Sequence, residues 1–297
     1  MESHDVSGVV GEVFRMKVLL FGLTGYGNNA FKVLINTPSV EMIGVLTVKR
    51  PLNPFPYYEC EKLHDVAFKH NIPLYEGLTL KEEKTYQLLK RLSPDMIVVS
   101  SFNQIIPQSI IVIPTYGVIN VHPSLLPKYK GATPTVWMLM NDEKEAGVTV
   151  HFIENEKVDA GRIITQRTLK IDPSDNEGTL RCKLAKFSEI ALAEALTLVV
   201  ENPKDVFPLQ NDAEATYYPK RTVKDAEIDL QKPFREILNT IRAMSPYPGA
   251  RLTYDGKTYI VKNAMMVRKK SFADAENIRA RELVVETPEG MITFYLA

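Results

Sequence analysis

The sequence predicts an α/β protein with a Rossmann-like, mostly parallel sheet, followed by a smaller β-rich, barrel-like domain. Short apolar segments alternate with helical segments from residue 16 to about residue 200, as expected when helices connect parallel strands. Beyond residue 250, strand-like segments follow one another with only tight turns between them. A chain of 297 residues is long enough for these two domains.

The first domain is predicted from five strand-like segments, each a short apolar run typical of a buried parallel strand. They lie at residues 16–22, 41–48, 72–77, 94–101 and 117–122. A turn over 23–29 precedes the first helix (30–37), and amphipathic patterns predict further helices at 60–71 and 80–92. Prolines and Gly131 predict an irregular loop after residue 122.

The pattern changes after residue 145. Segments 146–153 and 161–171 are predicted to form an antiparallel pair at the edge of the sheet, joined by an acidic loop. Residues 177–202 have apolar side chains at three- and four-residue steps and predict one long helix, which Pro203 ends.

The C-terminal part is predicted to contain one helix, over 234–246, and then strands separated by turns at Asp255-Gly256 and Glu289-Gly290. We therefore expect a flexible extension at 1–15, a catalytic domain at 16–202, a linker at 203–222 and a small β-rich domain at 223–297.

Composition excludes several classes of protein. Lys plus Arg and Asp plus Glu number 36 each, which argues against a large phosphate-binding surface, although a local basic patch stays open. Two cysteines, Cys60 and Cys182, are too few for a disulfide scaffold and favour a reducing, cytoplasmic location. The five histidines form no cluster with cysteine, so no metal site is expected. No apolar run is long enough to span a membrane.

The most informative segment is INVHPSLLPKYKGATPTVW, at 119–137. Asn120 and His122 stand two residues apart on a predicted strand, so their side chains share one face at its carboxyl end. Asp159, in the loop VDAG, is expected to reach the same edge. An amide and an imidazole suit stabilisation of an oxyanion and transfer of a proton, while a carboxylate orients the imidazole. This combination predicts acyl transfer to an amine, with an apparent pKa of about 6 to 8 for His122.

The other histidines and the glycines have simpler interpretations. His151, within a predicted strand, is expected to be a hydrogen-bonded partner inside the sheet, and His64 and His70 are expected to be solvated on a helix face. The glycines after the first strand are spaced GxxGxG rather than GxGxxG, and no acidic residue ends the second strand, which argues against a dinucleotide site.

The strings NVHPSLLPKYKGATP and VTVHFIENEKVDAGRIITQ resemble the folate-dependent formyltransferase family. The resemblance is specific over about 16–200, and continues more weakly through YYPKRTVKDAEIDL and IRAMSPYPGA. It implies 10-formyltetrahydrofolate as co-substrate, no metal, and Asn120, His122 and Asp159 as the catalytic residues. It also implies folate contacts from two loops: Ser101, Phe102, Asn103, Gln104 and Ile105; and Ser124, Leu125, Leu126 and Pro127.

The sequence leaves several candidates for the acceptor of the formyl group. Residues 203–297 contain 15 Lys and Arg against 13 Asp and Glu, a net charge of only +2, which is weak for tRNA binding. The string PKYKGATP and the turn LTGYG are also closer to the amino-sugar nucleotide branch of the family, which we expect first. Methionyl-tRNA is the second candidate, and Lys128 and Lys130 suit acceptor phosphates in either case. Hydrolysis of 10-formyltetrahydrofolate is a third, and the oligomeric state stays open, a homodimer included.

Overall fold

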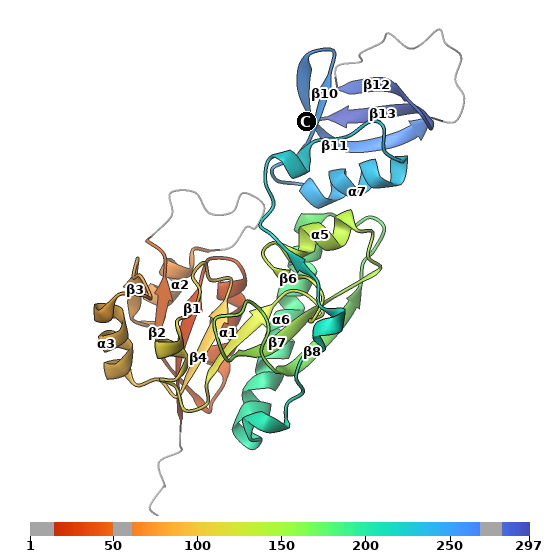
Figure 1. The fold of residues 1–297 in the computed structure, drawn as a ribbon. Helices are drawn as coiled ribbons and strands as arrows, with labels where there is room; N and C mark the ends of the chain where they lie inside the picture. The colour runs from red at the N-terminus through yellow and green to blue at the C-terminus, as the bar shows by residue number, and fades with distance from the viewer. Residues whose placement is uncertain (1–14, 50–60, 268–280) are drawn as a thin grey trace, which may run out of the picture.

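A computed structural model describes residues 15–49, 61–267 and 281–297. Nearly all of the extension expected at 1–15 therefore lies outside the described residues, as does Cys60. Within them, the α/β class with a second, antiparallel sheet is confirmed (Figure 1).

The first sheet has seven strands in the order β3-β2-β1-β4-β5-β7-β8. The first five of these strands are parallel to one another, whereas β7 runs antiparallel to both β5 and β8. The predicted edge pair is thus confirmed. The strand bounds are β1 Met16–Gly22, β2 Val40–Thr47, β3 Leu74–Glu76, β4 Met96–Ser100, β5 Val118–His122, β7 Glu145–Ile153 and β8 Ile163–Lys170.

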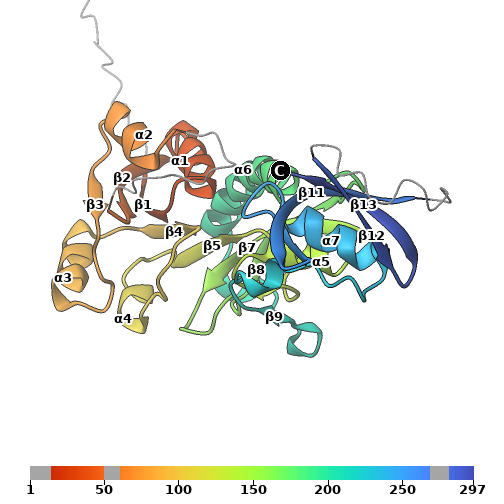
Figure 2. The same cartoon turned by 90° about the horizontal axis from the view of Figure 1, so that it is seen from above.

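The central strands are apolar throughout because helices cover both faces of the sheet. In β1, Val18 and Leu20 pack in one apolar cluster, while Leu19 and Phe21 pack in another on the opposite face. Figure 2 shows helices α1, α2 and α6 on one face and α3 and α4 on the other. Their bounds are α1 Tyr26–Asn36, α2 Leu63–Lys69, α3 Glu83–Leu92, α4 Gln108–Ile111 and α6 Glu177–Glu201.

Two local predictions were wrong around the loops. Helix α1 begins at Tyr26, inside the turn predicted over 23–29. The loop predicted after His122 ends at Pro134, which is the first residue of helix α5 (Pro134–Met140). Proline suits that position because the first turn of a helix does not use its N–H group. The short α4 was also not predicted, since four residues are too few to show a helical period.

The segment expected to be a linker, 203–222, runs back along the first sheet. After two 3-10 turns (Lys204–Val206 and Asp212–Glu214), its short strand β9 (Tyr217–Tyr218) pairs in parallel with β6 (Lys130–Gly131). A Cβ on Gly131 would lie 2.3 Å from the carbonyl oxygen of Tyr218, and Gly131 has a φ of +98°. Only glycine suits this close approach and this backbone conformation.

The C-terminal sheet is antiparallel, with the order β10-β11-β13-β12. Helix α7 (Phe234–Met244) lies between this sheet and α5, as Figure 1 shows. The strand bounds are β10 Ala250–Tyr254, β11 Lys257–Val267, β12 Glu282–Thr287 and β13 Gly290–Leu296, which agree closely with the predicted segments. Among the described residues, no helix has the length and hydropathy needed to cross a membrane.

Helix α6 provides a test of the core. Leu192 is 1% exposed and belongs to the larger apolar cluster, whereas Ile190 on the same helix is 55% exposed. We expect Leu192→Ala to lower the free energy of unfolding by about 2–5 kcal/mol, because it removes buried methyl groups and leaves a cavity. Ile190→Ala should change it by less than about 0.5 kcal/mol. Urea unfolding followed by circular dichroism measures both, and equal losses would contradict the assigned burial.

Candidate active site

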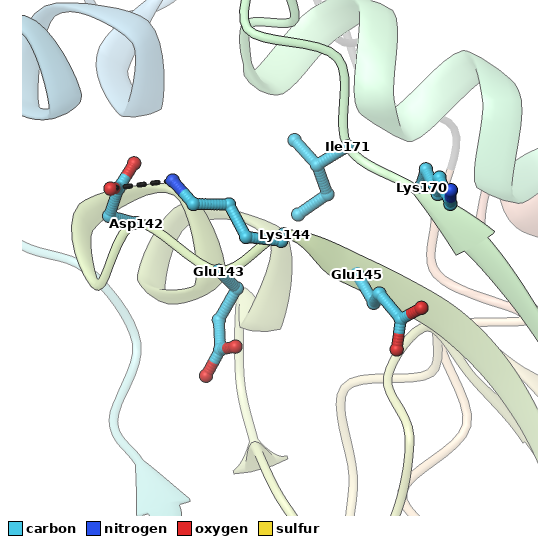
Figure 3. Close-up of a pocket in the computed structure, with 6 residues that line it drawn as sticks. All are labelled: Asp142, Glu143, Lys144, Glu145, Lys170 and Ile171. Carbon is cyan, nitrogen blue, oxygen red and sulfur yellow. Dashed lines mark hydrogen bonds and ion pairs between the residues drawn. The ribbon is translucent and has the colours of Figure 1, made fainter.

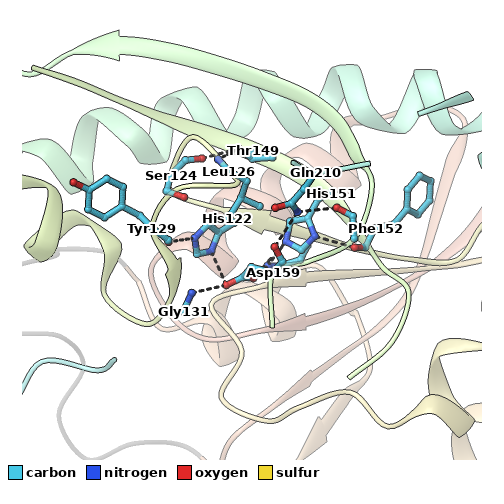
Figure 4. A network of polar contacts seen from close by, with 12 residues as sticks. His122, Ser124, Leu126, Tyr129, Gly131, Thr149, His151, Phe152, Asp159 and Gln210 are labelled. Atoms are coloured by element: carbon cyan, nitrogen blue, oxygen red, sulfur yellow. Dashed lines mark hydrogen bonds and ion pairs between the residues drawn. The ribbon is translucent and has the colours of Figure 1, made fainter. Parts of the chain in front are cut away.

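The three predicted catalytic residues meet at the carboxyl end of β5, where Figure 4 shows His122 and Asp159 beside each other. Asn120 and His122 lie on β5, and the loop between β7 and β8 brings Asp159 to them. Asp159 Oδ1 lies 3.2 Å from Asn120 Nδ2, and Asp159 Oδ2 lies 3.6 Å from His122 Nδ1. His122 is 5% exposed, so the cluster is largely removed from water.

A backbone carbonyl fixes the tautomer of His122. Its Nε2 lies 2.9 Å from the carbonyl oxygen of Tyr129, which can only accept a hydrogen bond. The neutral imidazole therefore carries its proton on Nε2, and Nδ1 is the basic nitrogen. At 3.6 Å the Asp159 carboxylate is too far for a hydrogen bond, but close enough to stabilise a proton taken up by Nδ1. The Tyr129 carbonyl, and not the carboxylate expected from the sequence, therefore orients the imidazole.

Burial lowers the pKa of His122 below its usual value, and this effect outweighs the opposing attraction of Asp159 and the hydrogen bond to Tyr129. The direction of this shift favours the neutral ring, which is the state that a general base requires.

Asp159 is held as a buried carboxylate. Burial on its own raises the pKa of Asp159, but three contacts reverse the effect: the attraction of the His122 imidazole, the His151 imidazole with Nε2 at 3.4 Å from Oδ1, and a 2.9 Å hydrogen bond from the Gly131 N–H. The net pKa is well below the usual range. Its φ of +49° places it in the left-handed region, which aspartate tolerates better than most residues. The carboxylate therefore remains ionised throughout the physiological range of pH.

His151 joins the cluster from the neighbouring strand and is 1% exposed. Its Nδ1 lies 2.8 Å from the Phe152 carbonyl oxygen, so Nε2 is free to accept, at 3.1 Å, a hydrogen bond from Asn120 Nδ2. His151 is therefore hydrogen-bonded inside the sheet, as expected. One of its two partners is Asn120, a predicted catalytic residue. The register of β5 against β7 places Asn120 opposite His151, and no sequence signal gives this register.

The amide of Asn120 is oriented by these contacts. Both hydrogens of Nδ2 point into the cluster, one toward His151 and the other toward Asp159. An oxyanion would therefore receive a hydrogen bond from Asn120 only in exchange for one of them. The two contacts have nearly the same length, 3.2 Å to Asp159 and 3.1 Å to His151, so distance does not decide which is exchanged.

The loop 101–105 after β4 divides into two groups. Ser101, Asn103 and Ile105 are exposed. Phe102 instead packs on Phe21 with ring centroids 5.3 Å apart, and the amide of Gln104 bonds to the backbone of residues 78 and 80. The first three are thus open to a ligand, whereas the other two hold the loop in place.

The turn 124–127 is built by the backbone and by Thr149. Thr149 Oγ1 donates to the Ser124 carbonyl at 2.7 Å and accepts from the Leu126 N–H at 3.1 Å. The peptide bond before Pro127 is cis. Ser124 and Leu126 are buried, so of this predicted set only Leu125 and Pro127 are partly exposed.

Two further predictions need correction. His64 is 5% exposed rather than solvated, because its Nε2 lies 3.0 Å from the Val48 carbonyl oxygen and 3.2 Å from Glu76 Oε1. The sequence pattern could not show that α2 turns this residue toward the sheet. Lys130 is also buried, with Nζ 3.6 Å from Asp212 Oδ1, whereas Lys128 is exposed as expected.

A hollow elsewhere on the surface contains none of the predicted residues (Figure 3). It is lined by Asp142, Glu143, Lys144, Glu145, Lys170 and Ile171. Hydrogen bonds from Arg235 of α7, supported by Lys144, lower the pKa of Asp142 to about 2. The charge of Asp142 is thus neutralised by Arg235 and Lys144. In the part of the chain that the structure describes, no group of three or more His, Cys, Asp or Glu side chains is arranged so that it could hold a metal ion.

Two family models match the chain. Residues 16–196 match "Formyl transferase" and residues 220–295 match "Formyl transferase, C-terminal domain". A methionyl-tRNA formyltransferase of Staphylococcus aureus (strain Newman) is 33% identical over 283 residues, which cover 93% of this chain and 86% of that protein.

Solved structures share the fold at lower identity. WlaRD, a sugar 3N-formyl transferase crystallised with dTDP and 5-N-formyl-THF, is 19% identical with a TM-score of 0.69, and the match covers 96% of this chain and 98% of that one. An N-formyltransferase from Helicobacter canadensis, in complex with folinic acid and dTDP-3-aminofucose, has the same identity and TM-score, covering 96% of this chain and 100% of the other.

The protonation state of His122 can be measured directly. Because its pKa lies below the usual value, the neutral ring is present above that pKa and is lost as the pH falls through it. In an NMR titration of the ¹⁵N-labelled protein, we expect a midpoint below about 6.5, and an Nε2–H tautomer above it. A midpoint above 7, or an Nδ1–H tautomer, would contradict the assigned geometry.

Proposed function

The chain belongs to the formyl transferase family, and we propose that it transfers a formyl group from 10-formyltetrahydrofolate to a primary amine. The observation that carries this proposal is the convergence of Asn120, His122 and Asp159 at one buried point of the sheet edge. A base, a carboxylate and an amide around one point suit the formation and collapse of a tetrahedral intermediate.

The proton steps follow from the tautomer of His122. A neutral amine attacks the formyl carbon, and Nδ1 of His122 accepts the proton that the amine then loses. Asp159, 3.6 Å from Nδ1, stabilises the imidazolium that results. The bond between the formyl carbon and N10 of the folate breaks, and N10 takes up one proton, directly from His122 or through water. The amine has lost one proton and the leaving nitrogen has gained one, so the reaction balances.

Asn120 suits the stabilisation of the negative charge. We infer that one Nδ2 hydrogen leaves its present contact, with Asp159 or with His151, and binds the oxygen of the intermediate. The new hydrogen bond to a charged oxygen offsets the loss of the old one.

We infer that the folate binds at the two loops 101–105 and 124–127. The exposed side chains Ser101, Asn103 and Ile105 and the partly exposed Leu125 and Pro127 are open to contact it. Phe102, Gln104, Ser124 and Leu126 support the same loops from within. We therefore assign the predicted folate set two roles, direct contact and loop support.

Two acceptors are each favoured by one observation. The nearly balanced charge of residues 203–297, with 15 Lys and Arg against 13 Asp and Glu, favours a small acceptor such as an amino-sugar nucleotide. Identity of 33% to a methionyl-tRNA formyltransferase, across 93% of this chain, favours methionyl-tRNA. Water as acceptor would use the same three residues, and would make the protein a hydrolase.

Replacement of the base tests the mechanism. We expect His122→Ala to lower kcat by about 10²- to 10⁴-fold, because proton transfer by a positioned side chain contributes that much. Binding of a non-reactive folate, measured by calorimetry, should be largely unchanged. His70→Ala is the matched control, since His70 is exposed, and should keep full turnover. Near wild-type turnover of His122→Ala would refute the assignment.

A panel of acceptors decides between the candidates. Turnover of 10-formyltetrahydrofolate is measured with initiator methionyl-tRNA, with nucleotide-linked 3-amino and 4-amino deoxysugars, and without acceptor. An amino-sugar enzyme should show the highest kcat/KM for one of the sugars and little response of that value to salt. A tRNA enzyme should formylate the tRNA with an affinity that falls steeply as salt rises. Equal turnover with and without every acceptor would instead identify a hydrolase.

A further inference from the structure

Gln210 contacts the loop that carries Asp159, although it lies in the segment expected to be a linker. Its Nε2 donates to the carbonyl oxygen of Asp159 at 2.9 Å and to that of Gly161 at 2.8 Å. The side chain thus bridges two carbonyls on either side of one residue, as Figure 4 shows for Gln210 beside Asp159.

This bridged loop has little freedom of its own. A Cβ on Gly161 would lie 1.8 Å from the carbonyl oxygen of Phe152, so the loop turns tightly against β7. Asp159 adopts a φ of +49°, which is uncommon for a residue other than glycine. A conformation of this kind persists only when its surroundings hold it, and the Gln210 amide supplies two of the hydrogen bonds that do so.

The same segment also holds the turn that orients His122. Thr216 Oγ1 accepts from the Tyr129 N–H at 2.8 Å, and the Thr216 carbonyl accepts from the Lys130 N–H at 2.8 Å. The carbonyl of Tyr129 is the group that fixes the His122 tautomer. Residues 210–216 therefore connect the loop of the carboxylate to the turn of the imidazole, and set their separation.

The acceptor atom of the Gln210 amide is unused. Its Oε1 is buried and has no hydrogen-bond partner among the described residues. An unpaired buried acceptor costs free energy, so the unpaired Oε1 reduces the contribution of the Gln210 side chain to the stability of the fold. The two donor contacts, both to the loop of Asp159, account for its placement.

We propose that Gln210 is a positioning residue for the reaction, acting by holding the Asp159 carboxylate against Nδ1 of His122. The proposal rests on the function proposed above. Without the amide, Asp159 is released from the position in which it stabilises the imidazolium. The proton transfer then slows, while the loops that contact folate, at 101–105 and 124–127, keep their own supports.

Gln210→Met is the informative variant, because methionine has a similar length and no donor. We expect kcat to fall by about tenfold or more, as when outer partners that orient reactive groups are removed, with little change in KM for 10-formyltetrahydrofolate. The NMR midpoint of His122 should also move to lower pH, because the carboxylate that favours its protonated form is less well placed.

Asn211→Ala is the matched control. Asn211 is the next residue of the segment and is exposed, and among the residues that the structure describes its side chain bonds within the neighbouring 3-10 turn, to Ala213 and Glu214. It should leave both kcat and the His122 midpoint unchanged. If Gln210→Met matches this control in both readouts, Gln210 has no positioning role and the proposal is wrong. A lower melting temperature with an unchanged midpoint and unchanged kcat would likewise make its role purely structural.

Two further comparisons keep the test decisive. If Gln210→Met does not fold, Gln210→Glu replaces it, since a carboxylate cannot donate and a protonated carboxyl group donates once. The ratio of the kcat of Gln210→Glu to that of the wild-type protein should rise as the pH falls. A variant whose kcat equals that of the wild-type protein at every pH would refute the proposal. If the wild-type protein transfers no formyl group but Gln210→Met still shifts the His122 midpoint, the proposed function fails while the positioning of Asp159 stands.

Discussion

The burial of one carboxylate governs the arrangement of the site. An ionised Asp159 in a dry environment is tolerated only where donors and a basic group surround it. The Gly131 N–H, the Asn120 amide and the His122 imidazole provide these contacts. Asn120 and His122 lie on β5 and Gly131 lies in the turn that follows, whereas Asp159 lies in the loop between β7 and β8, so the charge holds this loop against β5 and its turn. The same contacts keep Asp159 ionised and prepare it to stabilise a protonated His122.

The tautomer of His122 follows from a different group than chemical intuition suggests. A carboxylate beside an imidazole usually fixes its proton, but at 3.6 Å Asp159 leaves that role to the Tyr129 carbonyl, at 2.9 Å from Nε2. Nδ1 is then the nitrogen beside the carboxylate, 3.6 Å away. The group that orients the imidazole is thus a different one from the group that favours its protonated form.

The segment between the two sheets contributes to this geometry. It pairs with β6, stacks Tyr218 between Tyr129 and Trp137, and bonds through Gln210 to the loop of Asp159. A stretch whose composition indicates a linker is therefore packed against the turn and the loop that place the imidazole and the carboxylate. Its polar side chains are used to satisfy backbone groups of neighbouring loops, which composition alone cannot reveal.

The sequence by itself determined the α/β class, the order of the main strands and helices, and the shared face of Asn120 and His122, because buried strands and i, i+2 spacing leave clear local patterns. Asp159 was indicated by the family resemblance and not by such a pattern. Tertiary structure alone decided that His151 bonds to Asn120, that His64 is buried, and that Gln210 reaches Asp159. These features depend on strand register and on contacts between segments far apart in the chain. A side chain that acts across such a distance carries no local periodicity, so only the folded chain shows its partner.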